Sequence, residues 1–260
     1  MKNNSGFTLI EVLIAMVVSL VIMGGAYTFF NTQQRQTVIQ TNVSDAQQTL
    51  RAAMDFMSRD VRMAGYDPDD AGTFSIDSID DVNGMSAITF TWDNPNGPTS
   101  SSYSLSTVNG STVAPNSRAL MFNTGSGNEP LAGYITALGL AYAYDNNDDG
   151  ELDRDVNGNI IWAVDNGGTW LYLDDNDDGQ ITLDDDGNGN GVLDDGDSGP
   201  SVTLDTIRAV RIWMLAQSQA PDPKYTDTKT YVVGPHVVTP NNNFRHRLLE
   251  RTVLCRNMGL

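Results

Sequence analysis

Residues 6–11 read Gly-Phe-Thr-Leu-Ile-Glu, and they open an apolar run that covers residues 7–30 with a single charge, Glu11. A helix of this length, at about 1.5 Å per residue, measures roughly 36 Å, which is enough to cross a bilayer core of about 30 Å. Lys2 precedes the run, and a basic residue there favours a cytoplasmic N-terminus. The sequence therefore predicts a membrane-spanning helix over residues 7–30.

A secretory signal peptide is the main alternative for this segment, with Gly24-Gly25-Ala26 as its cleavage site. Such peptides have a shorter apolar region, of about 7–15 residues. The run in this chain is longer and holds an acid near its start. A charge inside an apolar segment is costly and more often serves a function. Both features favour a helix that is retained.

Gly6, Phe7 and Glu11 resemble the N-terminal signature of type IV prepilins. The resemblance implies a leader peptide at residues 1–6, cleavage between Gly6 and Phe7 by the prepilin peptidase, and methylation of the new amine on Phe7. It also implies that Glu11 offers its carboxylate to the N-terminal amine of a neighbouring pilin. The chain would then sit in the inner membrane as a single-pass protein, with its head outside the cytoplasm. After assembly it would be found in a pilus or at the cell surface.

The helix is expected to continue beyond the apolar run, as an amphipathic segment over residues 31–66. Apolar residues recur there every three or four positions, which is the helical period. No proline occurs before Pro68, and Gly65 is a plausible C-terminal cap. The stripe consists of Ile39, Val43, Ala46, Leu50, Ala53, Met57, Val61 and Ala64. Its simplest role is to pack against a globular head.

Residues 67–260 are expected to form that head, because short alternating stretches and Gly or Asn turns replace the helical period. The predicted strands cover residues 87–92, 102–106, 118–122, 138–144, 160–164, 169–173, 207–215, 231–233 and 244–254. The predicted fold class is α+β, the type IV pilin fold: a long N-terminal helix packed on an antiparallel sheet. Residues 207–218 and 245–257 resemble the central and C-terminal strands of PilW-type minor pilins. The J-type pseudopilins of type II secretion are close relatives by the same criterion.

The net charge of −18 arises almost entirely from one segment. Seventeen of the 33 acidic residues lie between Asp145 and Asp197, with one basic residue, Arg154. This balance argues against nucleic acid as a partner, because phosphate binding needs clustered Lys and Arg. A single cysteine, Cys255, excludes an intrachain disulfide, and two histidines leave little for imidazole chemistry. We find no catalytic constellation and expect a protein that is not an enzyme.

The acidic segment, residues 145–197, contains three frames with calcium-loop spacing. Such loops place oxygen ligands at the first, third, fifth, seventh, ninth and twelfth positions, with Gly at the sixth. The candidate ligands are Asp145, Asn147, Asp149, Glu151, Asp153 and Asp155 in the first frame, Asp174, Asn176, Asp178, Gln180 and Asp185 in the second, and Asp186, Asn188, Asn190, Val192, Asp194 and Asp197 in the third. The first frame has Val156 at its twelfth position, so Asp155 or a distant residue must complete it.

The spacing predicts two calcium ions in residues 174–197 and a third, weaker site at residues 145–155. Asp instead of Glu at the twelfth position indicates modest affinity. The alternative is a solvated acidic loop, which is the usual fate of a charge run. The second and third frames abut without an intervening helix, and the first follows a predicted strand, so the frames are not helix–loop–helix pairs.

Together these features predict a PilW-type minor pilin that joins other pilins or minor pilins in a priming or tip complex. Its calcium-bound insert would serve adhesion or subunit docking. Two other functions remain open. One is a J-type pseudopilin of type II secretion, and the other is a membrane-anchored, calcium-dependent adhesin that only borrows the anchor.

Overall fold

The structure is a computed structural model that describes residues 7–69, 72–81, 85–95, 97–107, 118–194, 196 and 198–259. Of the predicted site residues, Gly6 and Asp197 lie outside the described residues. The chain divides into two compact units, Met1–Ser44 and Asp45–Leu260.

One helix, α1 (Leu9–Val61), lies within the predicted range of residues 7–66. Within the second unit its apolar stripe is buried, at Ala46, Leu50, Ala53, Met54, Met57 and Val61. Gly65, the predicted C-terminal cap, lies four residues beyond the end of the helix and has a φ of +75°. A side chain there would also meet Met258 Cγ at 2.6 Å. Gly65 N donates to Thr91 O at 3.1 Å, so the chain enters the head directly after the helix.

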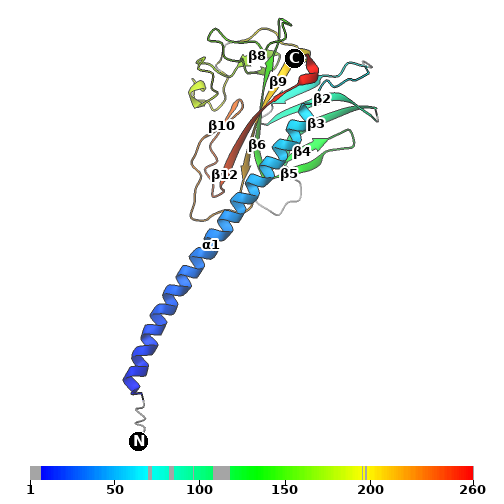
Figure 1. Cartoon of the computed structure of the whole chain (residues 1–260). Helices are drawn as coiled ribbons and strands as arrows, with labels where there is room; N and C mark the ends of the chain where they lie inside the picture. The colour runs from blue at the N-terminus through cyan, green and yellow to red at the C-terminus, as the bar shows by residue number, and fades with distance from the viewer. Residues whose placement is uncertain are drawn as a thin grey trace. The chain divides into compact units, whose positions relative to one another are not determined.

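The head contains two five-stranded antiparallel sheets and a small hairpin (Figure 1). Sheet one has the order β1-β2-β3-β4-β5, and sheet two has the order β12-β9-β6-β7-β8. The strands of sheet one are β1 (Ile76–Asp81), β2 (Ser86–Asn94), β3 (Gly97–Thr107), β4 (Arg118–Asn123) and β5 (Glu129–Gly133). Those of sheet two are β6 (Ile135–Tyr144), β7 (Ala163–Asn166), β8 (Thr169–Tyr172), β9 (Ile207–Gln217) and β12 (His246–Leu254), and the hairpin consists of β10 (Tyr231–Val233) and β11 (His236–Val238).

The predicted class, a long helix followed by an antiparallel head, is confirmed. The described residues divide the head strands between two five-stranded sheets and the hairpin, and the sequence analysis did not predict β1, β5 or β11. β1 carries three acids and β5 contains Pro130, so neither has the alternating apolar pattern that marks a half-buried strand. Pairing with β2 and β4 holds them in place instead.

The central strands of sheet two, β6 and β9, are buried on both faces. Along β6 and β9, alternate residues point to opposite sides. Leu140 and Met214 belong to one hydrophobic cluster, which also contains Met54 and Met57 of α1 and residues of sheet one. Ala141 and Trp213 belong to a second cluster. This arrangement explains why β9 reads as a nearly continuous apolar run, since a strand covered on both sides needs apolar residues on both.

The second cluster lies under the acidic insert and the hairpin. Its other members come from β7 and β8, from the insert, and from β10 and β11. Those from the insert and hairpin include Trp162, Leu173, Leu193, Tyr231 and Val233. The insert is therefore not a detached loop but part of an outer layer on sheet two.

Candidate functional site

The N-terminal end of α1 is fixed by a reciprocal capping box between Thr8 and Glu11. Thr8 N and Thr8 Oγ1 donate to Glu11 Oε2 at 2.9 and 2.8 Å, and Glu11 N donates to Thr8 Oγ1 at 3.4 Å. This exchange satisfies donors that the first helical turn leaves without partners. The sequence analysis missed Thr8, although Thr followed three residues later by Glu is a recognisable capping pattern. The capping box holds the Glu11 carboxylate at the start of the helix.

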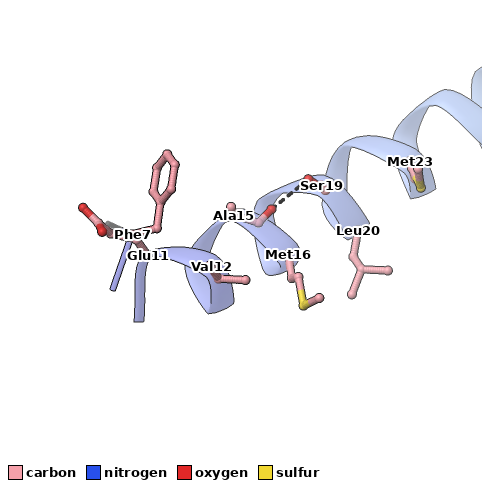
Figure 2. A pocket seen from close by; sticks show the side chains of 8 residues that line it. All are labelled: Phe7, Glu11, Val12, Ala15, Met16, Ser19, Leu20 and Met23. Carbon is pink, nitrogen blue, oxygen red and sulfur yellow. Dashed lines mark hydrogen bonds between the residues drawn. The ribbon is translucent and has the colours of Figure 1, made fainter. Parts of the chain in front are cut away.

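The face of α1 that carries Glu11 is a shallow groove with an almost entirely apolar lining. Figure 2 shows its residues, which are Phe7, Glu11, Val12, Ala15, Met16, Ser19, Leu20 and Met23. The hydroxyl of Ser19 is directed back to its own helix, donating to Ala15 O at 2.7 Å. Phe7 is 90% exposed and Leu20 is 69% exposed. Nothing within the described chain covers this segment, so its apolar surface requires a lipid or protein partner.

The three acidic frames share one local conformation. In each, the first carboxylate accepts hydrogen bonds from the N–H groups of the fifth and sixth residues. The third side chain accepts from the N–H of the fifth, and the fifth accepts from the N–H of the seventh. For the second frame these are Asp178 N to Asp174 Oδ1 at 3.1 Å, Gly179 N to Asp174 Oδ2 at 2.7 Å, Asp178 N to Asn176 Oδ1 at 2.9 Å and Gln180 N to Asp178 Oδ1 at 2.7 Å.

The first and third frames repeat this pattern. In the first, the acceptors are Asp145, Asn147 and Asp149, and the last bond comes from Glu151 N. In the third they are Asp186, Asn188 and Asn190, and the last bond comes from Val192 N. The fourth and sixth residues have positive φ throughout, at Asp148, Gly150, Asp177, Gly179, Gly189 and Gly191. We refer to residues 145–156, 174–185 and 186–197 as the first, second and third loops.

The loops differ in the carboxylate that accepts hydrogen bonds in the second half of each loop and so closes it. In the second, the twelfth residue, Asp185, is only 1% exposed, and it accepts from Asp175 N at 3.1 Å and Thr182 N at 2.8 Å. In the first, Asp153 takes a comparable place and accepts from Asn146 N at 3.4 Å. In the third, Asp194 Oδ1 accepts from Asn190 Nδ2 at 3.2 Å.

Asp155, the residue expected to complete the first loop, lies in a separate turn. It accepts from the N–H groups of Asn157 and Asn159 at 2.9 and 2.7 Å. Desolvation raises the pKa of the Asp155 carboxyl, but the hydrogen bonds from Asn159, Asn157 and Gly158 together outweigh it, so this pKa lies below its usual value. Val156, at the twelfth position, is 93% exposed. The first loop therefore closes through Asp153.

Two carboxylates in the loops are almost fully buried. Asp145 and Asp185 are each 1% exposed, and within the described residues neither forms an ion pair with a basic side chain. Burial raises the pKa of the Asp174 carboxyl, and the charges of Asp185 and Asp178 act in the same direction, against the N–H groups of Gly179 and Asp178. Among the residues that the structure describes, no three His, Cys, Asp or Glu side chains are arranged as a metal cluster. A cation in these loops would therefore also need amide and carbonyl oxygens.

The eighth residue of every loop points into the second hydrophobic cluster. Leu193 of the third loop is 1% exposed and is a member of that cluster. Leu152 of the first loop and Ile181 of the second pack against it. The three loops are therefore anchored in a common core, a connection that the sequence analysis did not predict.

Comparison with known proteins gives two family matches. Residues 1–27 match the prokaryotic N-terminal methylation motif, and residues 103–257 match the type IV pilus-assembly protein W family. No curated protein matches the chain. Among solved structures the chain is similar to a type IV-like pilin from Thermus thermophilus, with 13% identity, a TM-score of 0.43, and coverage of 82% of this chain and 98% of that chain. Because the second family match covers more than half of the sequence and the methylation motif precedes it, the chain belongs to the type IV pilus-assembly protein W family.

Proposed function

We propose that the chain is a minor pilin that is held in the inner membrane by residues 7–30, with its head outside the cytoplasm, and then enters a type IV pilus within a priming or tip complex. Its role is structural, in assembly. The observation that carries the proposal is the uncovered apolar groove on α1, which lies within the matched methylation motif at residues 1–27. Each large apolar side chain moved out of water contributes about 1.5–3 kcal/mol. A bundle of such helices therefore gives this segment a stable location outside the bilayer.

Glu11 is the residue that would fix the position of the subunit. Cleavage after Gly6 would leave a new amine on Phe7, which lies beside Glu11 in the groove. A carboxylate inside an apolar bundle is tolerated when it has a charged partner. The amine of a neighbouring pilin provides one, and Thr8 holds the carboxylate at the end of the helix where the two can meet.

The proposal is tested with the full-length chain expressed in its own cells. Glu11→Leu removes the carboxylate, and Glu11→Gln keeps an oxygen that can accept from Thr8 N but removes the charge. Both variants should insert in the membrane at parental levels and be strongly depleted from sheared filaments, as measured by immunogold labelling and immunoblotting. Parental amounts of Glu11→Gln in filaments would show that the charge is dispensable.

The same filament assay distinguishes the two alternative functions, a J-type pseudopilin of type II secretion and a membrane-anchored, calcium-dependent adhesin. A chain that is absent from filaments but required for protein export would act as a J-type pseudopilin. A chain that reaches the cell surface in cells without any filament machinery would act as a calcium-dependent adhesin.

We further propose that the loops bind calcium, two ions at residues 174–197 and a weaker third at residues 145–155. Support comes from the three repeated loop conformations and from the buried carboxylates Asp145 and Asp185, which within the described residues have no basic partner. In the second loop the ion would be bound by the side-chain oxygens of Asp174, Asn176, Asp178 and Asp185 and by the carbonyl of Gln180. Calcium accepts such mixed oxygen sets, whereas magnesium requires stricter octahedral geometry.

Calcium would act on the head through the outer layer of sheet two. Bound ions would order the loops and thereby hold the layer in place, which could then present a surface for adhesion or for another subunit. Calorimetric titration of the full-length chain in detergent micelles should detect binding. The paired variants Asp174→Ala with Asp178→Ala, and Asp186→Ala with Asp197→Ala, should each remove one binding event. The absence of binding heat with millimolar calcium would mean that the segment is a solvated acidic loop.

A further inference from the structure

The third loop is joined to the β10–β11 hairpin by backbone pairing. Val237 N donates to Gly191 O at 2.8 Å, and Leu193 N donates to Pro235 O at 2.8 Å. Val192 and His236 form an antiparallel bridge between these two bonds. Among the described residues, the first and second loops make no such backbone pairing with the hairpin. Of the three loops, the third is therefore the one that described backbone hydrogen bonds join to β11.

The hairpin in turn lies directly on sheet two. A Cβ atom at Gly139 of β6 would fall 2.6 Å from Gly234 N and closer still to the carbonyl of Val233. Gly234, at the turn, has a φ of +62°. The two backbones therefore touch at a point where only glycine leaves room. The side chains of Tyr231 and Val233 complete the cover over the second hydrophobic cluster.

A chain of side-chain hydrogen bonds connects the hairpin to both sheets. His236 Nε2 lies 2.6 Å from Asp81 Oδ1 at the end of β1. Ser86 Oγ donates to Asp81 Oδ2 at 2.8 Å, and Leu140 N donates to Ser86 Oγ at 3.0 Å. His236 and Asp81 are each 17% exposed at the side chain. The turn of the hairpin, at residues 233–237, is thus held by the third loop on one side and by sheet one and β6 on the other.

We propose that calcium in the third loop, and not calcium in the other two, controls the closure of the β10–β11 hairpin over β6. The inference rests on the calcium-binding part of the proposed function. The third loop reads Asp-Gly-Asn-Gly-Asn-Gly from residue 186, with glycine at three of six positions. Glycine loses more conformational freedom on ordering than any other residue, so this loop gains most from an ion that fixes it.

Hydrogen–deuterium exchange of the full-length chain in micelles tests the proposal, with free calcium set by buffers. If opening of the hairpin requires release of the ion, exchange in peptides over residues 231–238 slows about tenfold for each tenfold rise in free calcium above Kd. Asp186→Ala should abolish this dependence. Asp174→Ala, the matched change in the second loop, should leave it intact. Equal effects of the two variants would overturn the assignment to the third loop.

A second variant tests the coupling from the opposite side. Gly139→Ala leaves every loop residue unchanged but displaces the hairpin, so exchange over residues 231–238 should accelerate. Because coupling between two sites is reciprocal, calcium affinity of the third loop should fall while that of the second stays the same. Faster exchange with unchanged affinity would overturn the proposal.

Calorimetry separates this inference from the calcium proposal. If calcium binds but exchange over residues 231–238 does not respond to it, only the coupling fails. If the parental chain takes up no calcium, the calcium proposal fails first, and the coupling fails with it.

Discussion

Asp178→Asn separates the structural role of a loop carboxylate from its role as a calcium ligand. Asp178 Oδ1 accepts from Gln180 N at 2.7 Å, and the equivalent residue of the third loop, Asn190, accepts from Val192 N at the same distance. The third loop therefore shows that an amide can make this turn. Without calcium, the change should leave the free energy of unfolding unaltered or slightly raised, because Asp178 repels the partly buried Asp174.

With calcium the same substitution should destabilise the head. An ion present at about a hundredfold excess over Kd stabilises the folded chain by about 2.7 kcal/mol. If loss of one ligand charge weakens Kd about tenfold, this contribution falls to about 1.4 kcal/mol, a loss of about 1.3 kcal/mol. For a unit of about 200 residues that corresponds to a decrease in Tm of about 3–5 °C.

The assay is thermal melting of the full-length chain in micelles, with calcium and with a chelator. Asn190→Asp in the third loop is the inverse control. Without calcium it should destabilise the chain, because Asn190 Nδ2 donates to Asp194 Oδ1 at 3.2 Å and a second carboxylate there would repel Asp194. With calcium it should gain stability relative to its own calcium-free state by more than the parent does. An equal decrease in Tm for Asp178→Asn with and without calcium would refute the ligand role.

Three further changes have defined outcomes. Mass spectrometry of the membrane-extracted chain should find a methylated N-terminus at Phe7, and Gly6→Phe should leave full-length precursor; a mature start near residue 27 would contradict both. Leu193→Ala should lower the free energy of unfolding by about 2–5 kcal/mol, because it opens a cavity in the second cluster, and an effect below about 1 kcal/mol would show that the outer layer is loosely attached. Tyr103→Phe removes the hydroxyl that donates to Asp60 Oδ2 at 2.6 Å and should cost about 1–2 kcal/mol at neutral pH. Burial raises the pKa of the Asp60 carboxyl, and the hydrogen bond from the Tyr103 hydroxyl opposes that shift. The difference in unfolding free energy between the variant and the parent should therefore shrink as the pH falls and Asp60 becomes protonated. A difference that does not change with pH would point to packing alone.

The helix and its end were predictable because their signals are local. An apolar run and a helical period extend over many residues of α1, and the φ of +75° at Gly65 follows from the lack of a side chain. The conformation of the acidic loops was predictable for the same reason. Each of their characteristic hydrogen bonds, such as that from Gly179 N to Asp174 Oδ2, joins residues no more than five positions apart.

The two-sheet arrangement was not predictable in this way. β1 is held by pairing with β2 and by the contact of Asp81 with His236, which lies 155 residues away. No spacing within either segment indicates that contact. The run of β9, apolar on both faces, showed that something must cover sheet two on each side, but it did not show what covers it.

The acidic insert is part of what covers sheet two, but its composition suggests solvent exposure and therefore did not predict this role. Leu152, Ile181 and Leu193 lie in short stretches between segments rich in carboxylates and glycines, so no long stripe or alternation marks them as core residues. Once each loop is folded, however, the side chain at the eighth position of all three packs on or within the same cluster. A cation that fixes one loop therefore also restricts a side chain in a core shared with the other two. In each loop, the carboxylates that would bind calcium lie within a few positions of the apolar residue that attaches the loop to the core. Calcium binding and the stability of the head should therefore change together.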